Sequence, residues 1–368
     1  MAVSRINEAG LNVNQYGNRN LVINGAMQVA QRGTSFTGLG ADGESYNLDR
    51  FVTFASSTAG RATITQDADS PDGLANSLKI ACTTADTSVA AGEIFFLQHR
   101  IEGQDLQRFA KGTSAAKEYT VSFYVKGNAS ATYVCELYDV DNDRHVAKTF
   151  SVTTGWTRVE LTFPADTTGA FGDDNGRSLD LTIWLHAGST YTGGTLPSTW
   201  AAKVNANRAV GATTSIFDST SRTFFITGLQ MEVGDTATDF EHRTFGDELQ
   251  RCQRYCQRHP SQDQADGGNY SLLGAAGWAS STTNANVPMQ LPTTMRLEPT
   301  ATFSGNWRIL HTNTASTVSS GPTINDSYCS VSAVYMQATC SASLTAGQGA
   351  AINANNDTDA HVILDAEL

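Results

Sequence analysis

The sequence predicts an all-β protein, in which a jelly-roll β sandwich is followed by a short linking helix and a second small β sandwich. Apolar and polar residues alternate over several short stretches, and this period of two is typical of half-buried strands. Turn-forming residues separate the stretches, as at Asp141-Asn142-Asp143. A helical period occurs clearly only once, after Thr244. Together these observations favour a sandwich or jelly roll over a helical or mixed fold.

The clearest strand is expected over 117–127, where Tyr119, Val121, Phe123 and Val125 share one face. The other strands expected in the first body are 132–140, 144–152, 156–164 and 179–186. A strand through Leu229–Val233 closes this body, with Gln230 and Glu232 on its polar face.

Two segments of the first body interrupt the strand pattern. The segment 103–112 predicts a single helical turn, and 188–220 predicts a long loop rich in Thr, Gly, Ala and Asn. Long loops in compact domains are usually functional or held in place by a neighbour.

The helix is expected over 244–260. Phe245, Leu249, Cys252 and Cys256 recur at spacings of four, three and four, which places them on one helical face. Thr244 is a suitable N-cap. This face either packs inside the protomer or meets its copies around a three-fold axis, so the four residues are a candidate oligomer interface.

The remaining residues, 261–368, predict a second β unit with a different composition. Arg296 and Arg308 are its only basic residues, set against eight acidic ones, and it contains no lysine. Its strands are expected at 270–279, 286–291, 300–303, 330–338 and 361–368. The domain order is therefore 1–19, 20–243, 244–260 and 261–368.

Composition and charge exclude several classes of function. Only 16% of the 368 residues are charged, and the net charge is −12, which disfavours binding to the phosphates of nucleic acids. No stretch approaches the ~20 apolar residues that span a bilayer, and Met1–Asn20 has no apolar signal core, so neither membrane insertion nor secretion is expected. The six cysteines are expected to be free thiols. A disulfide between Cys329 and Cys340 is the alternative that the sequence leaves open.

Three motifs resemble a known family. They are NLVINGAMQVAQRGTSF at Asn20–Phe36, YNLDRFV at Tyr46–Val52, and GLQMEVGDTATDFEHRTFGDELQRCQRYCQ from Gly228. In this order they resemble tail-fibre and other virion proteins of tailed bacteriophages, of the marine podovirus-like kind, over roughly 20–259. The family usually has two aromatic residues where this chain has Tyr255 and Cys256.

The resemblance implies a fold, partners and a location. It implies a jelly roll similar to carbohydrate-binding modules, in a homotrimeric fibre on the outside of the tail or capsid that is assembled in the host cytoplasm. The segment 1–19 would dock to other virion proteins, and the distal β domains would bind host polysaccharide or lipopolysaccharide. The alternatives are a capsid-attached fibre or decoration protein, a polysaccharide depolymerase, and a secreted carbohydrate-binding module.

Sugar binding also has candidate residues of its own. Trp184 and His186 share the outer face of the 179–186 strand with Asp180 and Thr182, and rings beside carboxylates and imidazoles suit sugars. Alternatively, Trp184 packs beneath the 188–220 loop, covered by Tyr191 or Trp200. The last domain adds the aromatic candidates Trp278, Trp307, Tyr328 and Tyr335, which are otherwise core residues.

No catalytic, cofactor or metal motif is recognisable. The sequence has neither a G-x-S-x-G elbow nor an H-E-x-x-H helix, so a non-enzymatic protein is expected. Asp139, Asp141 and Asp143 begin like a calcium loop, but Arg144 and Phe150 occupy the positions that need Gly and Glu. The segment 173–176 (Asp-Asp-Asn-Gly) either holds a structural cation or is a simple turn.

Overall fold

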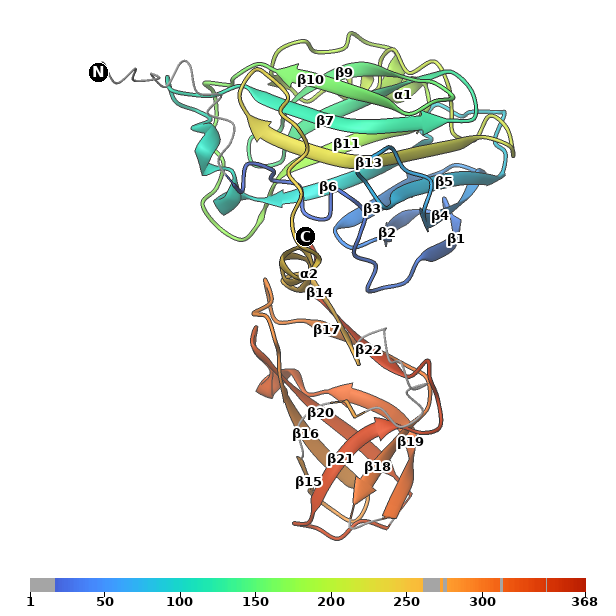
Figure 1. Ribbon diagram of the computed structural model, residues 1–368, viewed down its shortest axis with the longest axis vertical. Helices are drawn as coiled ribbons and strands as arrows, with labels where there is room; N and C mark the ends of the chain where they lie inside the picture. Colours follow the sequence, from blue (N-terminus) through green and yellow to red (C-terminus); the bar gives the residue numbers. More distant parts are fainter. Residues whose placement is uncertain (1–16, 261–271, 274–276, 312–313, 342) are drawn as a thin grey trace, which may run out of the picture. The chain divides into compact units, whose positions relative to one another are not determined.

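The computed structural model describes residues 17–260, 272–273, 277–311, 314–341 and 343–368 (Figure 1). The chain forms two compact units, Met1–Phe245 together with Leu368, and Gly246–Glu367. Most of the expected docking segment, 1–16, lies outside the described residues. No helix among the described residues is long and apolar enough to cross a membrane.

The first unit is a sandwich of two antiparallel sheets, as the alternating pattern predicts. The six-stranded sheet has the order β1-β4-β5-β13-β7-β10, and the seven-stranded sheet has the order β12-β9-β8-β11-β6-β3-β2. The strands of the first sheet are β1 Ser35–Leu39, β4 Arg61–Asp67, β5 Ser77–Thr84, β13 Thr223–Val233, β7 Tyr119–Gly127 and β10 Thr157–Phe163. Those of the second are β12 Ala201–Ala202, β9 Arg144–Val152, β8 Ala131–Asp139, β11 Arg177–Ala187, β6 Ile94–Glu102, β3 Phe51–Ser56 and β2 Gly43–Tyr46.

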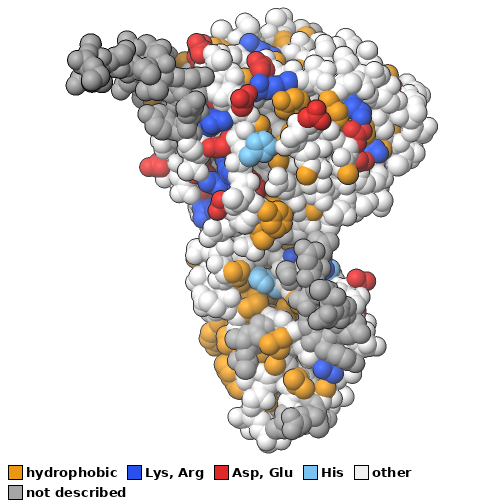
Figure 2. Space-filling model, in the orientation of Figure 1, with side chains coloured by type: hydrophobic (Ala, Val, Ile, Leu, Met, Phe, Trp, Pro, Cys, Tyr) orange, Lys and Arg blue, Asp and Glu red, His pale blue; other side chains and the backbone are white. Residues whose placement is uncertain are grey.

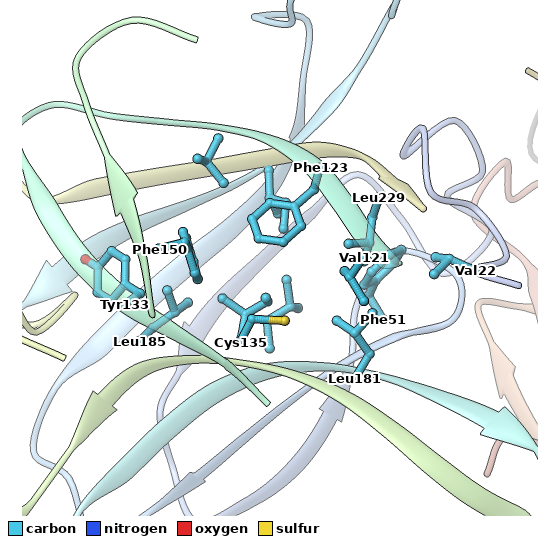
Figure 3. Close-up of a cluster of buried hydrophobic side chains, with 14 of the residues drawn as sticks. Val22, Phe51, Val121, Phe123, Tyr133, Cys135, Phe150, Leu181, Leu185 and Leu229 are labelled. Carbon is cyan, nitrogen blue, oxygen red and sulfur yellow. The ribbon is translucent and has the colours of Figure 1, made fainter. Parts of the chain in front are cut away.

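The core lies between the two sheets and is built by alternate residues of their strands. Figure 3 shows Phe123 of β7 facing Cys135 of β8 and Leu181 of β11 across this layer. All three are fully or almost fully buried. Burial of one such large apolar side chain stabilises a fold by roughly 1.5–3 kcal/mol. Because successive side chains of a strand point to opposite faces, apolar residues at every second position place all of these side chains in the core.

The connections between the strands differ only slightly from those that the sequence predicts. The Asp141-Asn142-Asp143 turn joins β8 to β9, and the expected helical turn is two 3₁₀ turns, Gly103–Asp105 and Gln107–Phe109. The long loop contains a four-residue helix, α1 (Ser189–Thr192), the short strand β12 and a 3₁₀ turn, Asn205–Asn207.

Strand β13 differs from the half-buried strand that was expected. Gln230 and Glu232 on its polar face are also buried, because the following segment folds over them. Gln230 Nε2 donates to Glu232 Oε1 at 2.9 Å, and the backbone N–H of Thr238 donates to the same oxygen at 2.9 Å. A local polar pattern cannot reveal this cover, which comes from residues farther along the chain.

The expected helix 244–260 is wrong in its second half. Helix α2 covers only Phe245–Gln253, and Cys256–His259 is strand β14, paired with β22 (His361–Asp365). Cys252 and Cys256 are fully buried within the protomer, while Phe245 is 55% exposed. The four residues therefore do not form one accessible helical face, and the two cysteines are core residues.

The second unit is a closed barrel with a small sheet, where a sandwich was expected. The barrel order is β15-β16-β20-β19-β18-β21, and the separate sheet has the order β14-β22-β17. Their strands are β15 Gly277–Ala279, β16 Asn284–Gln290, β20 Ala333–Cys340, β19 Thr314–Ile324, β18 Trp307–His311, β21 Gly349–Ala354 and β17 Thr300–Ser304. Part of the expected strand 270–279 lies outside the described residues. Both Cys329 and Cys340 are free thiols, so the pair left open by the sequence does not form.

Candidate functional site

The outer face of the seven-stranded sheet carries a group of buried polar side chains. Strand register aligns them in rows. Asp180 of β11 lies opposite Arg100 of β6 and Tyr138 of β8. In the next row, Thr182 lies opposite Gln98 and Glu136. Because residues two apart share a face, the sandwich core on the other side leaves these side chains pointing outward.

Glu136 is the centre of the first polar cluster. Its carboxylate accepts from Arg208 Nη2 at 2.9 Å, from the indole Nε1 of Trp184 at 2.8 Å, and bonds His145 Nδ1 at 2.8 Å. Burial alone would raise the pKa of Glu136, but Arg208 and His145 outweigh it and lower the pKa. The carboxylate is thus held ionised and anchors Arg208, which comes from the long loop.

A second cluster surrounds Asp180. Arg177 donates to both of its carboxylate oxygens, at 2.7 and 2.5 Å. Gln98 links this pair to Arg100, since its Oε1 accepts from Arg100 Nε at 2.8 Å. Arg100 also pairs with Glu44. Burial raises the pKa of Asp180, and Arg177 only partly opposes the shift.

Aromatic rings continue this face beside the polar rows. Phe54 and Phe96 stack at a centroid distance of 5.3 Å, and Phe96 contacts Trp184 at 5.1 Å. Tyr191 of α1 lies 5.5 Å from Trp184, which is fully buried. The guanidinium of Arg208 lies 4.9 Å from the Trp184 ring and 5.3 Å from that of Tyr138.

These polar and aromatic groups border one pocket of about 220 Å³. Its apolar side is formed by Phe54, Phe96 and Tyr191, and its polar side by arginines, carboxylates and amides. The polar lining residues are Glu44, Gln98, Arg100, Tyr138, Arg177, Asp180, Asn205 and Arg208. Pockets that enclose drug-sized ligands measure ~300–1,000 Å³, so this one suits a single small ring.

The pocket offers both kinds of contact that a polyhydroxylated ring needs. Rings provide apolar surface against C–H groups, while guanidinium N–H groups donate and carboxylates accept. Every arginine in the lining is paired with a carboxylate, so its orientation is fixed before any ligand arrives. The site is therefore preorganised for hydroxyl groups and has no excess of positive charge for an anion.

The structure separates the predicted sugar contacts of the first unit. Asp180 and Tyr191 line the pocket, whereas Trp184 is fully buried and contributes no surface to it. Tyr191, one of the two expected residues, helps to cover this side chain together with Phe96 and Arg208. Trp200 is instead 7% exposed and joins the sandwich core, where its ring lies 5.6 Å from Tyr119. His186 is 2% exposed and bonds Glu93 and Ser215.

The aromatic candidates of the last domain divide in the same way. Trp307 is 3% exposed and belongs to the barrel core, so it is not a surface contact. Trp278 is 41% exposed and Tyr328 is 69% exposed. These two remain available to a ligand.

One group of described residues has the side-chain types of a metal site. The ligand atoms of Asp86, Glu93 and His186 lie within 4.8 Å of one another, and all three residues are buried. Asp86 accepts from the Thr58 hydroxyl at 2.9 Å and from backbone N–H groups, and His186 Nε2 lies 3.1 Å from Glu93. Hydrogen bonds within the chain thus explain the cluster.

The two acidic turns also have bonding partners within the chain. Asp174 Oδ1 accepts from the backbone N–H of Gly176 at 2.8 Å, which is ordinary turn geometry. Asp139 accepts from Lys111 Nζ at 2.5 Å, and Asp143 pairs with Lys203. Lysines therefore pair with two of the three aspartates of the sequence that begins like a calcium loop, and Asp141 accepts from the backbone N–H of Gly172 at 2.9 Å.

Sequence reasoning missed most of the pocket. Phe96, Gln98 and Arg100 alternate on β6, and this order of polar and aromatic residues was an available indication of an outward face. The sequence around Phe54 and Arg208 gave no such indication. Both residues line the pocket only because β3 and the long loop meet that face of the sheet.

Comparison with solved structures finds matches at low TM-score and low sequence identity. A solved structure described as CBM4 matches with a TM-score of 0.31 and 14% identity, over 58% of this chain and 99% of that one. A family 11 carbohydrate-binding module from Clostridium thermocellum matches with a TM-score of 0.27 and 9% identity, over 57% and 98%. The enzymatically active domain of tailspike protein 4 of bacteriophage CBA120 matches with a TM-score of 0.30 and 11% identity, over 58% of this chain but only 21% of that chain.

The strands of the structure themselves show that the protein is mostly β, with a sandwich of two antiparallel sheets and a small C-terminal barrel region. No family model matches the sequence, and no curated protein matches it.

Proposed function

We propose that this protein is a non-enzymatic glycan-binding protein, and that the pocket on the outer face of the seven-stranded sheet holds one sugar ring of a longer chain. The observation that carries the proposal is the meeting of Phe54, Phe96 and Tyr191 with the paired groups Arg177–Asp180 and Arg100–Glu44 in one pocket. Stacking and hydroxyl recognition are thereby offered to the same small ligand.

The proposal is tested by titrating the full chain with a panel of soluble host-surface polysaccharides and their oligosaccharides in a calorimeter. Phe54→Ala removes the ring on β3 and should weaken binding at this site on the order of tenfold, a change of ~1.4 kcal/mol. Tyr124→Ala is the matched control, because Tyr124 is also half-buried but lies on β7, in the other sheet. Equal affinities of the two variants would rule out the pocket.

We further propose that the protein is a virion component of a tailed phage, most simply a homotrimeric tail fibre whose glycan sites act together on the host surface. The support is the three sequence motifs that resemble such proteins. Weak contacts on linked chains multiply in effect, which explains the use of one-ring pockets. A capsid-attached fibre or decoration protein is the alternative with the same fold.

Light scattering of the purified full chain at two concentrations tests the oligomeric state. A mass three times that of the 39.2 kDa chain at both concentrations is expected. A monomer at both would contradict an autonomous trimeric fibre and favour a subunit organised only by the particle.

A polysaccharide depolymerase is the second candidate function, and one observation favours it. Glu44 and Asp180 line the same pocket, and their pKa values move in opposite directions, since burial raises that of Asp180 while Arg100 outweighs burial and lowers that of Glu44. Glycosidases use such a pair of carboxylates. New reducing ends on incubation with host polysaccharide, lost in Asp180→Asn, would replace the binding proposal with this one.

A further inference from the structure

The barrel of the second unit carries a row of aromatic rings on its outer surface. Trp278 of β15 lies 6.0 Å from Tyr335 of β20, and Tyr335 lies 5.1 Å from Tyr328, measured between ring centroids. Trp278 and Tyr328 are 41% and 69% exposed. Single exposed hydrophobic residues are common on protein surfaces, whereas contiguous exposed patches more often serve as binding surfaces.

Hydrogen bonds of the backbone hold this row in place. Tyr328 lies in the 3₁₀ turn Asp326–Tyr328, which follows Asn325. The backbone N–H of Asn325 donates to the carbonyl of Tyr335 at 2.9 Å, and that of Tyr335 donates to Cys329 Sγ at 3.3 Å. Both ends of the turn are thus attached to β20 at Tyr335, so the most exposed ring has a fixed position and less freedom to lose on binding.

Amide side chains accompany the rings across the same strands. Trp278 lies opposite Asn286 of β16, and Asn286 lies opposite Gln337 of β20. Gln337 Nε2 donates to Asn286 Oδ1 at 3.1 Å, and Asn325 Nδ2 approaches Gln337 Oε1 at 3.5 Å. Each amide NH₂ has two donors and each carbonyl two lone pairs, so the half-buried Asn325 and Gln337 retain capacity toward a ligand, while Asn286, which is 7% exposed, holds Gln337 in place.

The charge around this surface selects among ligands. The barrel patch, defined as Trp278, Tyr328, Tyr335, Asn286, Asn325 and Gln337, contains no ionisable acid or base other than its tyrosines. Asp326 is exposed beside it, in the same turn as Tyr328. Figure 2 shows that Lys, Arg, Asp and Glu gather over the first unit, while the visible surface of the second is mainly hydrophobic or uncharged. An anionic ligand would find no cation in the patch and a carboxylate next to it.

We infer that the barrel patch is a second glycan site, specific for neutral polysaccharide, with sugar rings stacked on Trp278 and Tyr328 and their hydroxyls bonded to the amides. This inference deepens the proposed function and rests on it. The three rings are inclined to one another, by 67° and 43°, so they match a twisted single chain rather than a flat crystalline surface. Two ring-sized contacts explain how a shallow surface gains affinity without charge.

The test uses the full chain carrying Phe54→Ala, so that binding at the pocket is weakened and the barrel patch makes the larger contribution. The probes are neutral oligosaccharides of glucose and of galactose, with an oligouronate of equal length for comparison. In this background Tyr328→Ala and Trp278→Ala should each weaken neutral binding on the order of tenfold. Tyr328→Phe should retain it, because the ring stays.

Leu310→Ala is the matched control, since Leu310 is 38% exposed on β18 of the same barrel. The inference is overturned if Tyr328→Ala and Leu310→Ala bind alike, if the oligouronate binds as well as the neutral probes, or if no probe binds. It is also overturned if Tyr328→Ala changes the mass by light scattering, since the patch would then join copies of the chain. Loss of binding through Tyr328 with no effect of Phe54→Ala would leave this site standing and reject only the pocket.

Discussion

The pocket of the first unit and the barrel patch of the second achieve a similar polar and aromatic character by different physical means. In the pocket, charged groups are buried and paired, as in Arg177–Asp180 and Arg208–Glu136. In the barrel patch, rings are exposed and the polar groups are neutral amides, as in Gln337–Asn286. The pocket depends on the stability of its sheet and loop, whereas the patch depends on a few side chains over an independent core.

The largest effect is expected from removing the charge at the base of the pocket. Glu136→Gln leaves Arg208 and His145 without their carboxylate, and breaking a buried pair in this way costs about 3–5 kcal/mol of unfolding free energy. Denaturant unfolding measures the change. Glu160→Gln is the control, because Glu160 is 50% exposed in its pair with Arg158 and should change stability by less than ~1 kcal/mol. Similar small losses in both variants would show that the buried cluster does not support the fold.

Acid should destabilise the first unit through its buried histidines. His99 is fully buried, its Nε2 accepts from the backbone N–H of Ile23 at 3.2 Å, and burial places its pKa well below the usual 6.5. The unfolded chain therefore binds the proton first as pH falls. The free energy of unfolding should therefore decrease as the pH falls below ~6.5, by at most ~1.4 kcal/mol per pH unit for one histidine.

Unfolding free energies measured between pH 8 and 5 test this slope. His99→Gln keeps an acceptor for Ile23 but does not titrate, so it should flatten the slope. His242→Gln is the control, because His242 is exposed. An unchanged slope in His99→Gln would assign the acid sensitivity to other groups. The barrel patch contains no histidine or carboxylate, so its glycan binding should not follow this dependence.

A smaller effect on stability separates the two sites. Tyr328→Ala removes a ring that is 69% exposed, so the unfolding free energy should change by less than ~0.5 kcal/mol even though binding falls. Phe54→Ala also removes a ring stacked on Phe96 and should cost about 1 kcal/mol. A large loss of stability in Tyr328→Ala would mean that its ring supports the barrel rather than a ligand.

The smallest effect is expected from salt. In the Phe54→Ala background, the dissociation constant of a neutral oligosaccharide should change by less than about twofold between 50 and 500 mM NaCl, because screening acts only on charges. In Tyr328→Ala the same titration measures binding at the pocket. Salt screens the ion pairs that orient its side chains, including the one made by Arg177, which is 32% exposed, so the change there should be larger. A strong salt dependence at the patch would point to an anionic ligand.

Much of the first unit could be predicted from local pattern. The alternation at Tyr119–Val125 and at Leu179–Leu185 became β7 and β11, because a strand with one face in the core must repeat every two residues. The same argument correctly placed the inward faces that meet in the core (Figure 3). It could not say whether the outward residue Trp184 is exposed, because Tyr191 and Arg208 help to cover it from a loop without periodicity.

The sequence by itself determined the all-β class, the strands whose two faces differ in polarity, and the scarcity of basic residues in 261–368. Tertiary structure decided that Cys256–His259 is a strand, since its pairing with β22 outweighs a local helical pattern. It also decided that Trp307 is core while Trp278 is exposed, and that Phe54 and Arg208 meet in one pocket. Local periodicity shows which residues share a face, but only contacts between distant segments fix what covers that face.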